Sequence, residues 1–153
     1  MLEQISFNLG ILQPVYWKGV LCHQTALDMW NYQEIIWERK PKIILEVGRA
    51  DGGTWNFMKD LNLVETVLSI DINEPIPNIK NAMIFIDSDV YNKENILKDL
   101  ETYSPMANIL IVCHTNREDW GAIHAVKEWR QAHKEVKEFF PKRPTAHTWL
   151  TLT

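Results

Sequence analysis

Hydrophobic positions change their spacing along the chain, and this change predicts the secondary structure. Short apolar runs, typical of parallel strands buried on both faces, alternate with segments of helical spacing. The predicted strands are Lys42–Val47, Thr66–Ile72, Ala82–Ile86, Ile109–Val112, Lys137–Phe140 and His147–Leu152. The predicted helices are Thr25–Arg39, Thr54–Leu61, Asn92–Tyr103 and Ala122–Val136. This order predicts an α/β fold with a Rossmann-like, mainly parallel sheet flanked by helices.

The two ends of the chain lie outside this regular alternation. Residues 1–24 have no clear period, so we expect an irregular N-terminal arm on a single domain of residues 1–153. The last two strands are expected to pair as an antiparallel hairpin. Thr25 is the expected N-cap of the first helix. The apolar residues that recur at helical spacing in that helix are Leu27, Trp30, Ile35 and Trp37.

Composition narrows the classes of partner. The net charge of −4 and the pI near 5.7 argue against nucleic acid, which favours a basic surface. No apolar run approaches the roughly 20 residues of a membrane helix, and the start lacks the basic region of a signal peptide. The two cysteines, Cys22 and Cys113, are far apart in sequence, which favours a reducing, cytoplasmic compartment.

Candidate chemistry lies where the predicted strands end. A glycine-rich turn with Gly48, Gly52 and Gly53 follows the first strand, and Asp71 ends the second. Glycines let a ligand approach the backbone, and an acid at the second strand end can accept hydrogen bonds from ribose hydroxyls. Glu46 precedes the turn, where it would repel a pyrophosphate but could hold an ammonium group. The turn therefore favours S-adenosylmethionine over a dinucleotide, while a tight turn that only packs helix on strand stays an alternative.

Several segments together resemble the cephalosporin hydroxylase family. They are Trp17–Val20, Leu27–Ile36, Ile44–Gly48 with Gly52-Gly53, Ile86–Asp89, Leu100–Pro105 and Ala125–Trp129. The resemblance implies the class I S-adenosylmethionine-dependent methyltransferase fold and relatives that are sugar O-methyltransferases. It also implies that Glu46, Gly48 and Gly52 line the methionine end of the cofactor and that Asp71 holds the ribose. Ala50, Gly53 and Asp87 are further cofactor-binding residues, and Asp87 also matches a divalent-metal ligand.

The resemblance breaks down after the fourth strand, where the family has an acidic metal-binding pair. This chain has Cys113 and His114 there. Three interpretations stay open: Asp87, Cys113 and His114 bind a softer metal ion, His114 acts as a general base without a metal, or the site is degenerate. In addition, Gln24 stands where the family has a lysine. His147 heads the last strand and is expected to be exposed to solvent.

A second departure is the ten-residue link from Asn73 to Ala82, which leaves no room for the strand and helix that the family has there. We therefore expect a fold that lacks one strand-helix unit and leaves one sheet edge unpaired, open to a second copy of the chain. Ile72, Pro75 and Ile76 are the expected cover of the adenine.

These observations predict a methyltransferase that transfers the methyl group of S-adenosylmethionine to an oxygen of a small molecule or sugar, with His114 or an ion on Asp87 assisting deprotonation. The alternative is a catalytically degenerate protein of the same fold that binds a nucleoside weakly or serves as an interaction module.

Overall fold

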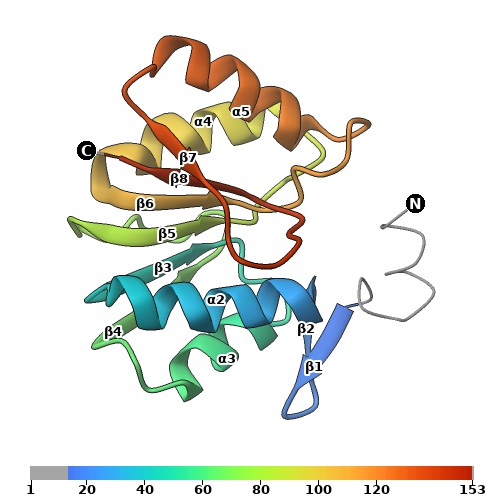
Figure 1. The fold of residues 1–153 in the computed structure, drawn as a ribbon, viewed down its shortest axis with the longest axis vertical. Coiled ribbons are helices and arrows are strands. Elements are labelled where there is room, and N and C mark those ends of the chain that lie inside the picture. Colours follow the sequence, from blue (N-terminus) through green and yellow to red (C-terminus); the bar gives the residue numbers. More distant parts are fainter. Residues whose placement is uncertain (1–13, 153) are drawn as a thin grey trace.

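A six-stranded sheet forms the centre of the computed structural model, which describes residues 14–152 (Figure 1). The strand order is β4-β3-β5-β6-β8-β7, with β8 antiparallel to both of its neighbours. The strands are β3 (Ile43–Val47), β4 (Thr66–Ile70), β5 (Ala82–Ile86), β6 (Ala107–Val112), β7 (Lys137–Phe139) and β8 (Thr148–Thr151). The predicted mainly parallel sheet and its terminal hairpin are confirmed.

Helices cover both faces of the sheet (Figure 1). They are α2 (Ala26–Arg39), α3 (Gly53–Asp60), α4 (Lys93–Tyr103) and α5 (Gly121–Ala132), with a short 3-10 helix, η1 (Ser104–Met106), after α4. Two apolar clusters result, one with α2 and α3 on one face and one with α4 and α5 on the other. None of the helices within residues 14–152 has the length and apolar content that crossing a membrane requires.

The expected irregular arm is wrong where the structure describes it. Residues 14–25 form a hairpin of β1 (Pro14–Trp17) and β2 (Val20–Thr25). Lys18 and Gly19 both have positive φ, the backbone of a two-residue hairpin turn whose twist matches that of the strands. Residues 1–13 of the expected arm lie outside the described part of the chain.

Of the four apolar residues at helical spacing in the first helix, only Ile35 is buried in the core. Thr25 caps α2 as predicted, since its side chain accepts a hydrogen bond from the amide of Asp28. However, Trp30 and Trp37 are 54% and 64% exposed. Beside Ile35, the buried face is formed by Asp28, Met29, Asn31, Tyr32 and Ile36. Its polar members have partners on the chain between β7 and β8, a pairing that helical spacing alone does not reveal.

The shortened link is confirmed, because residues 71–81 contain no helix or strand. The link crosses over β3, which lies between β4 and β5. Among the strands of residues 14–152, β3 is the one that pairs with β4, so the outer edge of β4 has no strand beside it in this part of the chain, as expected. Pairing of a second copy along that edge stays a prediction.

Candidate functional site

The glycine-rich turn holds the carboxyl ends of three strands together. The amide of Gly48 donates to the Ile70 carbonyl at the end of β4. The amide of Asp87, after β5, donates to the Val47 carbonyl of β3. Gly48 has a φ of +96°, and a Cβ built there would lie 2.4 Å from the carbonyl oxygen of Asp87. Glycine is therefore required at Gly48 both by its backbone conformation and by this close approach.

A cavity of about 420 Å³ opens between Gly48 of this turn, the loop after β4 and one side of α4, from Asn95 to Tyr103. This volume is within the usual range of small-molecule sites. Its wall combines apolar and polar side chains: Val47, Gly48, Asp71, Ile72, Asn73, Glu74, Ile76, Ser88, Asp89, Asn95, Lys98, Asp99, Thr102 and Tyr103. We call it the strand-end pocket. Ile72 and Ile76 belong to the wall as expected, whereas Pro75 does not.

Asp71 stands on the wall of the strand-end pocket with one carboxylate oxygen engaged by the chain. Its Oδ1 accepts from the Ile72 amide over 2.8 Å. Glu74 accepts from the Asp71 amide and forms an ion pair with Arg49 of the glycine turn. This arrangement ties the two loops together, and the Asp71 side chain remains exposed on the pocket wall.

Glu46 is placed differently from the expectation. It is buried on the α3 face of the sheet, where its carboxyl accepts from Ser69 Oγ over 2.7 Å, and it is absent from the wall of the strand-end pocket. Burial raises the pKa of Glu46 to about 8, and the nearby charge of Asp87 acts in the same direction. The expected direct contact with a cofactor ammonium therefore finds no support in this geometry.

Asp87 and His114 come together at the ends of β5 and β6. His114 Nε2 lies 3.2 Å from Asp87 Oδ1, and Gln24 donates to Asp87 Oδ2 over 2.6 Å. Burial lowers the pKa of His114, but the hydrogen bond and charge of Asp87 outweigh it, so the net pKa is raised. Gln24, at the position of the family's lysine, therefore fixes a carboxylate that stabilises the protonated imidazole of His114.

Cys113 does not join this pair. Its side chain is buried, and Sγ lies 3.8 Å from the hydroxyl of Tyr32 and 3.9 Å from Nε2 of Gln24. Burial raises the pKa of Cys113 well above its usual value, and a metal ligand must be a thiolate. Within residues 14–152, no group of three His, Cys, Asp or Glu side chains has an arrangement that could hold a metal ion. The donor set at Asp87 therefore does not match the metal hypothesis.

The expectation of a solvent-exposed His147 is wrong. His147 is buried, and its Nδ1 accepts from the His114 amide over 3.0 Å. Its Nε2 lies 2.7 Å from the Tyr32 hydroxyl and 3.6 Å from Asp28. Burial lowers the pKa of His147, which agrees with a neutral ring whose Nδ1 is an acceptor. His147 thereby supports the backbone of His114, whose φ is +56°.

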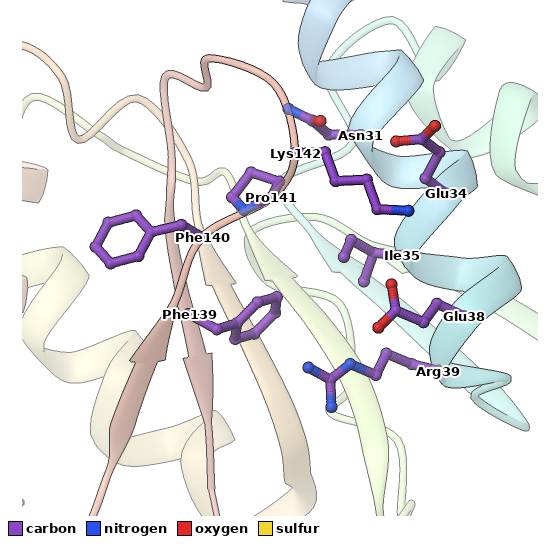
Figure 2. Close-up of a pocket in the computed structure, with 9 residues that line it drawn as sticks. All are labelled: Asn31, Glu34, Ile35, Glu38, Arg39, Phe139, Phe140, Pro141 and Lys142. Atoms are coloured by element: carbon purple, nitrogen blue, oxygen red, sulfur yellow. The ribbon is translucent and has the colours of Figure 1, made fainter.

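A second hollow, of about 210 Å³, lies between α2 and the chain after β7 (Figure 2). Its lining is Asn31, Glu34, Ile35, Glu38, Arg39, Phe139, Phe140, Pro141 and Lys142. It shares no residue with the strand-end pocket, and none of the sequence-predicted site residues lines it. The candidate chemistry is therefore in the loops at the strand ends.

Part of the chain is similar in sequence to proteins named Rhamnosyl O-methyltransferase. A family model described as Rhamnosyl O-methyltransferase/CmcI matches residues 10–82. The Rhamnosyl O-methyltransferase of Mycobacterium leprae is 39% identical over 61 residues, which are 37% of this chain and 27% of that protein. The corresponding protein of Mycobacterium bovis (strain BCG) is 36% identical over 89 residues, 53% of this chain and 36% of its own length. The chain thus spans about a third of these relatives.

Solved structures share the fold across most of the chain. The methyltransferase PaMTH1 of Podospora anserina, bound to SAH, has a TM-score of 0.57 and 13% identity, and covers 84% of this chain and 79% of its own. The O-methyltransferase of Bacillus cereus in complex with SAH has a TM-score of 0.54 and 11% identity. This match covers 97% of this chain and 86% of that one. These likenesses confirm the expected fold class, while the name cephalosporin hydroxylase stays a prediction.

Proposed function

We propose that this chain binds S-adenosylmethionine in the strand-end pocket and transfers its methyl group to a hydroxyl of a sugar. The observation that carries the proposal is the wall of that pocket, where the Gly48 turn, Asp71 and two isoleucines meet at the ends of adjacent parallel strands. Ligands of open parallel sheets bind at this edge. The sequence similarity to rhamnosyl O-methyltransferases over residues 10–82 supports a sugar acceptor.

The residues of the strand-end pocket match the parts of the cofactor. Asp71 would accept hydrogen bonds from the ribose hydroxyls, and Ile72 and Ile76, which are 85% and 52% exposed, would cover the adenine. Burial of such isoleucines removes apolar surface from water, which would stabilise the complex. The absence of a Cβ at Gly48 lets the turn lie against the backbone of Asp87, although Asp87 and His114 themselves are not on the wall of the pocket.

The Asp87–His114 pair would handle the proton. When bound, S-adenosylmethionine supplies a methyl group on a positively charged sulfur. His114 would take the proton of an acceptor hydroxyl that receives this methyl group. Asp87 stabilises the imidazolium that forms, and Gln24 holds the second carboxylate oxygen in place. His147 maintains the His114 backbone through its Nδ1.

The catalytic part is tested with His114→Gln, assayed with S-adenosylmethionine and methyl α-L-rhamnopyranoside. We expect kcat to fall by about a hundredfold or more, since a positioned base contributes about 10²–10⁴. The affinity for SAH should stay within about threefold, a change below 0.7 kcal/mol. His124→Gln is the matched control, because His124 is exposed on α5. Equal kcat values for both variants would remove His114 from the mechanism.

A second candidate is a nucleoside-binding or interaction module without catalysis. The unpaired edge of β4 and the burial of Cys113 and Glu46 favour it. In that case SAH binds to the wild type, but no methyl ether forms with any sugar acceptor. A reducing, cytoplasmic location is part of the proposal under either candidate, and the two buried free thiols, Cys22 and Cys113, support it.

A further inference from the structure

An aromatic pair stands next to His114 and has no part in the steps described above. The rings of Trp120 and His114 have centroids 5.7 Å apart, and those of Tyr91 and Trp120 are 4.6 Å apart with an interplanar angle of 58°. Tyr91 is 66% exposed, whereas the large apolar surface of an aromatic side chain is usually mostly buried. A chain of three rings therefore leads from His114 to an open aromatic surface.

The backbone around this pair is fixed. The amides of Gly121 and Ala122, at the start of α5, donate to the carbonyls of Tyr91 and Val90 over 3.2 and 3.0 Å. A Cβ at Gly121 would lie 2.3 Å from the Lys93 amide nitrogen and 2.7 Å from the Tyr91 carbonyl oxygen. The loop after β5 and the first turn of α5 are thus in direct contact, and Tyr91 and Trp120 are held beside each other.

Polar groups suited to sugar hydroxyls border the pair. The guanidinium of Arg117 lies 5.1 Å from the centroid of the Trp120 ring. Arg117 also donates two hydrogen bonds of 2.9 Å to the Asp119 carboxylate, which holds both planar groups in one orientation. Both side chains are exposed, so they can exchange water for ligand hydroxyls. The aromatic ring can contact the C–H groups of a sugar, and the planar donors and acceptors beside it can bind the sugar hydroxyls.

We propose that Tyr91 and Trp120 form the acceptor platform, on which the apolar face of a pyranose ring stacks while Arg117 and Asp119 bind its hydroxyls. The platform rests on the proposed function, because its position beside His114 matters only if a hydroxyl is methylated there. Tyr91 supplies the exposed ring, and Trp120 sets the separation between this ring and His114.

The test measures binding of methyl α-L-rhamnopyranoside by saturation-transfer NMR and calorimetry, to the protein alone and to the protein saturated with SAH. Tyr91→Ala is expected to weaken binding about tenfold, whereas Tyr91→Phe should bind within about twofold of the wild type, since the ring is the contact. Trp37→Ala is the control, because Trp37 is similarly exposed but lies on α2. Thermal unfolding establishes that each variant is folded.

The outcomes separate the platform from the proposed function. Equal affinities for Tyr91→Ala and Trp37→Ala, or no saturable sugar binding by the wild type with and without SAH, overturn the platform. If SAH itself does not bind but the sugar does, with loss in Tyr91→Ala, the proposed methyl transfer is wrong and the sugar site stands. Saturation transfer strongest to the ring hydrogens on one face of the sugar supports stacking on Tyr91.

Discussion

Replacement of Gly48 by alanine tests how closely the glycine turn approaches the loop after β5. The new Cβ would lie 2.4 Å from the Asp87 carbonyl oxygen and 2.8 Å from the Ser88 Cα, both of which are backbone atoms. Neither can move without displacing the end of β5. In addition, a φ of +96° disfavours any residue with a side chain.

The expected loss of folding stability in Gly48→Ala has two parts of comparable size. A left-handed backbone costs alanine about 1–2 kcal/mol, and forced overlap in a packed region costs about 1–3 kcal/mol. Gly48→Ala should therefore lower the free energy of unfolding by about 2–5 kcal/mol, a large share of the roughly 5–15 kcal/mol of a typical domain. For a chain of this length the melting temperature should fall by about 10 °C.

Gly52→Ala is the matched control in the same turn. Gly52 has a φ of +80°, but a Cβ there would meet only the Arg49 Cγ, at 3.8 Å. The free energy of unfolding of Gly52→Ala should fall only by the cost of the left-handed backbone, about 1–2 kcal/mol. Urea unfolding followed by circular dichroism measures both variants, with the midpoint compared at constant slope. Equal destabilisation of Gly48→Ala and Gly52→Ala would refute the close contact between Gly48 and Asp87.

Two further predictions concern buried titratable groups. Because the folded pKa of Glu46 is raised from 4.5 to about 8, the folded state binds more protons in this window, and stability should decrease as pH rises from about 4.5 to 8. Glu46→Gln should flatten that decrease in urea titrations across pH; an unchanged pH profile would mean that Glu46 is ionised when folded. Because the pKa of His147 is lowered, stability should also be lost as pH falls below about 6.5. His147→Ala should lower the free energy of unfolding by about 3 kcal/mol, because the His114 amide and the Tyr32 hydroxyl lose their partner. His124→Ala, at an exposed position, should change the melting temperature little, and equal effects of the two histidine variants would contradict the buried network.

The sheet could be predicted because its strands are continuous apolar runs. Ala82–Ile86 was predicted to the residue, since all five of its side chains are buried and a fully buried strand has no polar interruption. The link after β4 was predictable from its length alone. The hairpin of β1 and β2 was missed, although Lys18-Gly19, between two short segments rich in apolar residues, is a turn signal that could have revealed it.

Site residues were harder to predict when their partners are distant in sequence. Neighbours in sequence also diverge: Cys113 points into the core with Tyr32, whereas His114 turns toward Asp87. The burial of His147 depends on Tyr32 and Asp28, more than 100 residues away, so no local pattern indicates it. The resemblance pointed to Asp71, which lies on the wall of the strand-end pocket, and to Asp87, whose role stays a prediction. It could not predict that Gln24 would bind Asp87.

The central claim is that the strand-end pocket binds the nucleoside part of the cofactor, and calorimetric titration with SAH tests it most directly. Wild-type protein should bind SAH at one saturable site. Asp71→Asn should bind about ten- to a hundredfold more weakly, because it loses hydrogen bonds to a charged acceptor. Glu65→Gln, which removes an exposed acid just before β4 at its opposite end, should bind like the wild type. No detectable binding by the wild type at millimolar SAH, or equal affinities for the two variants, would contradict the claim.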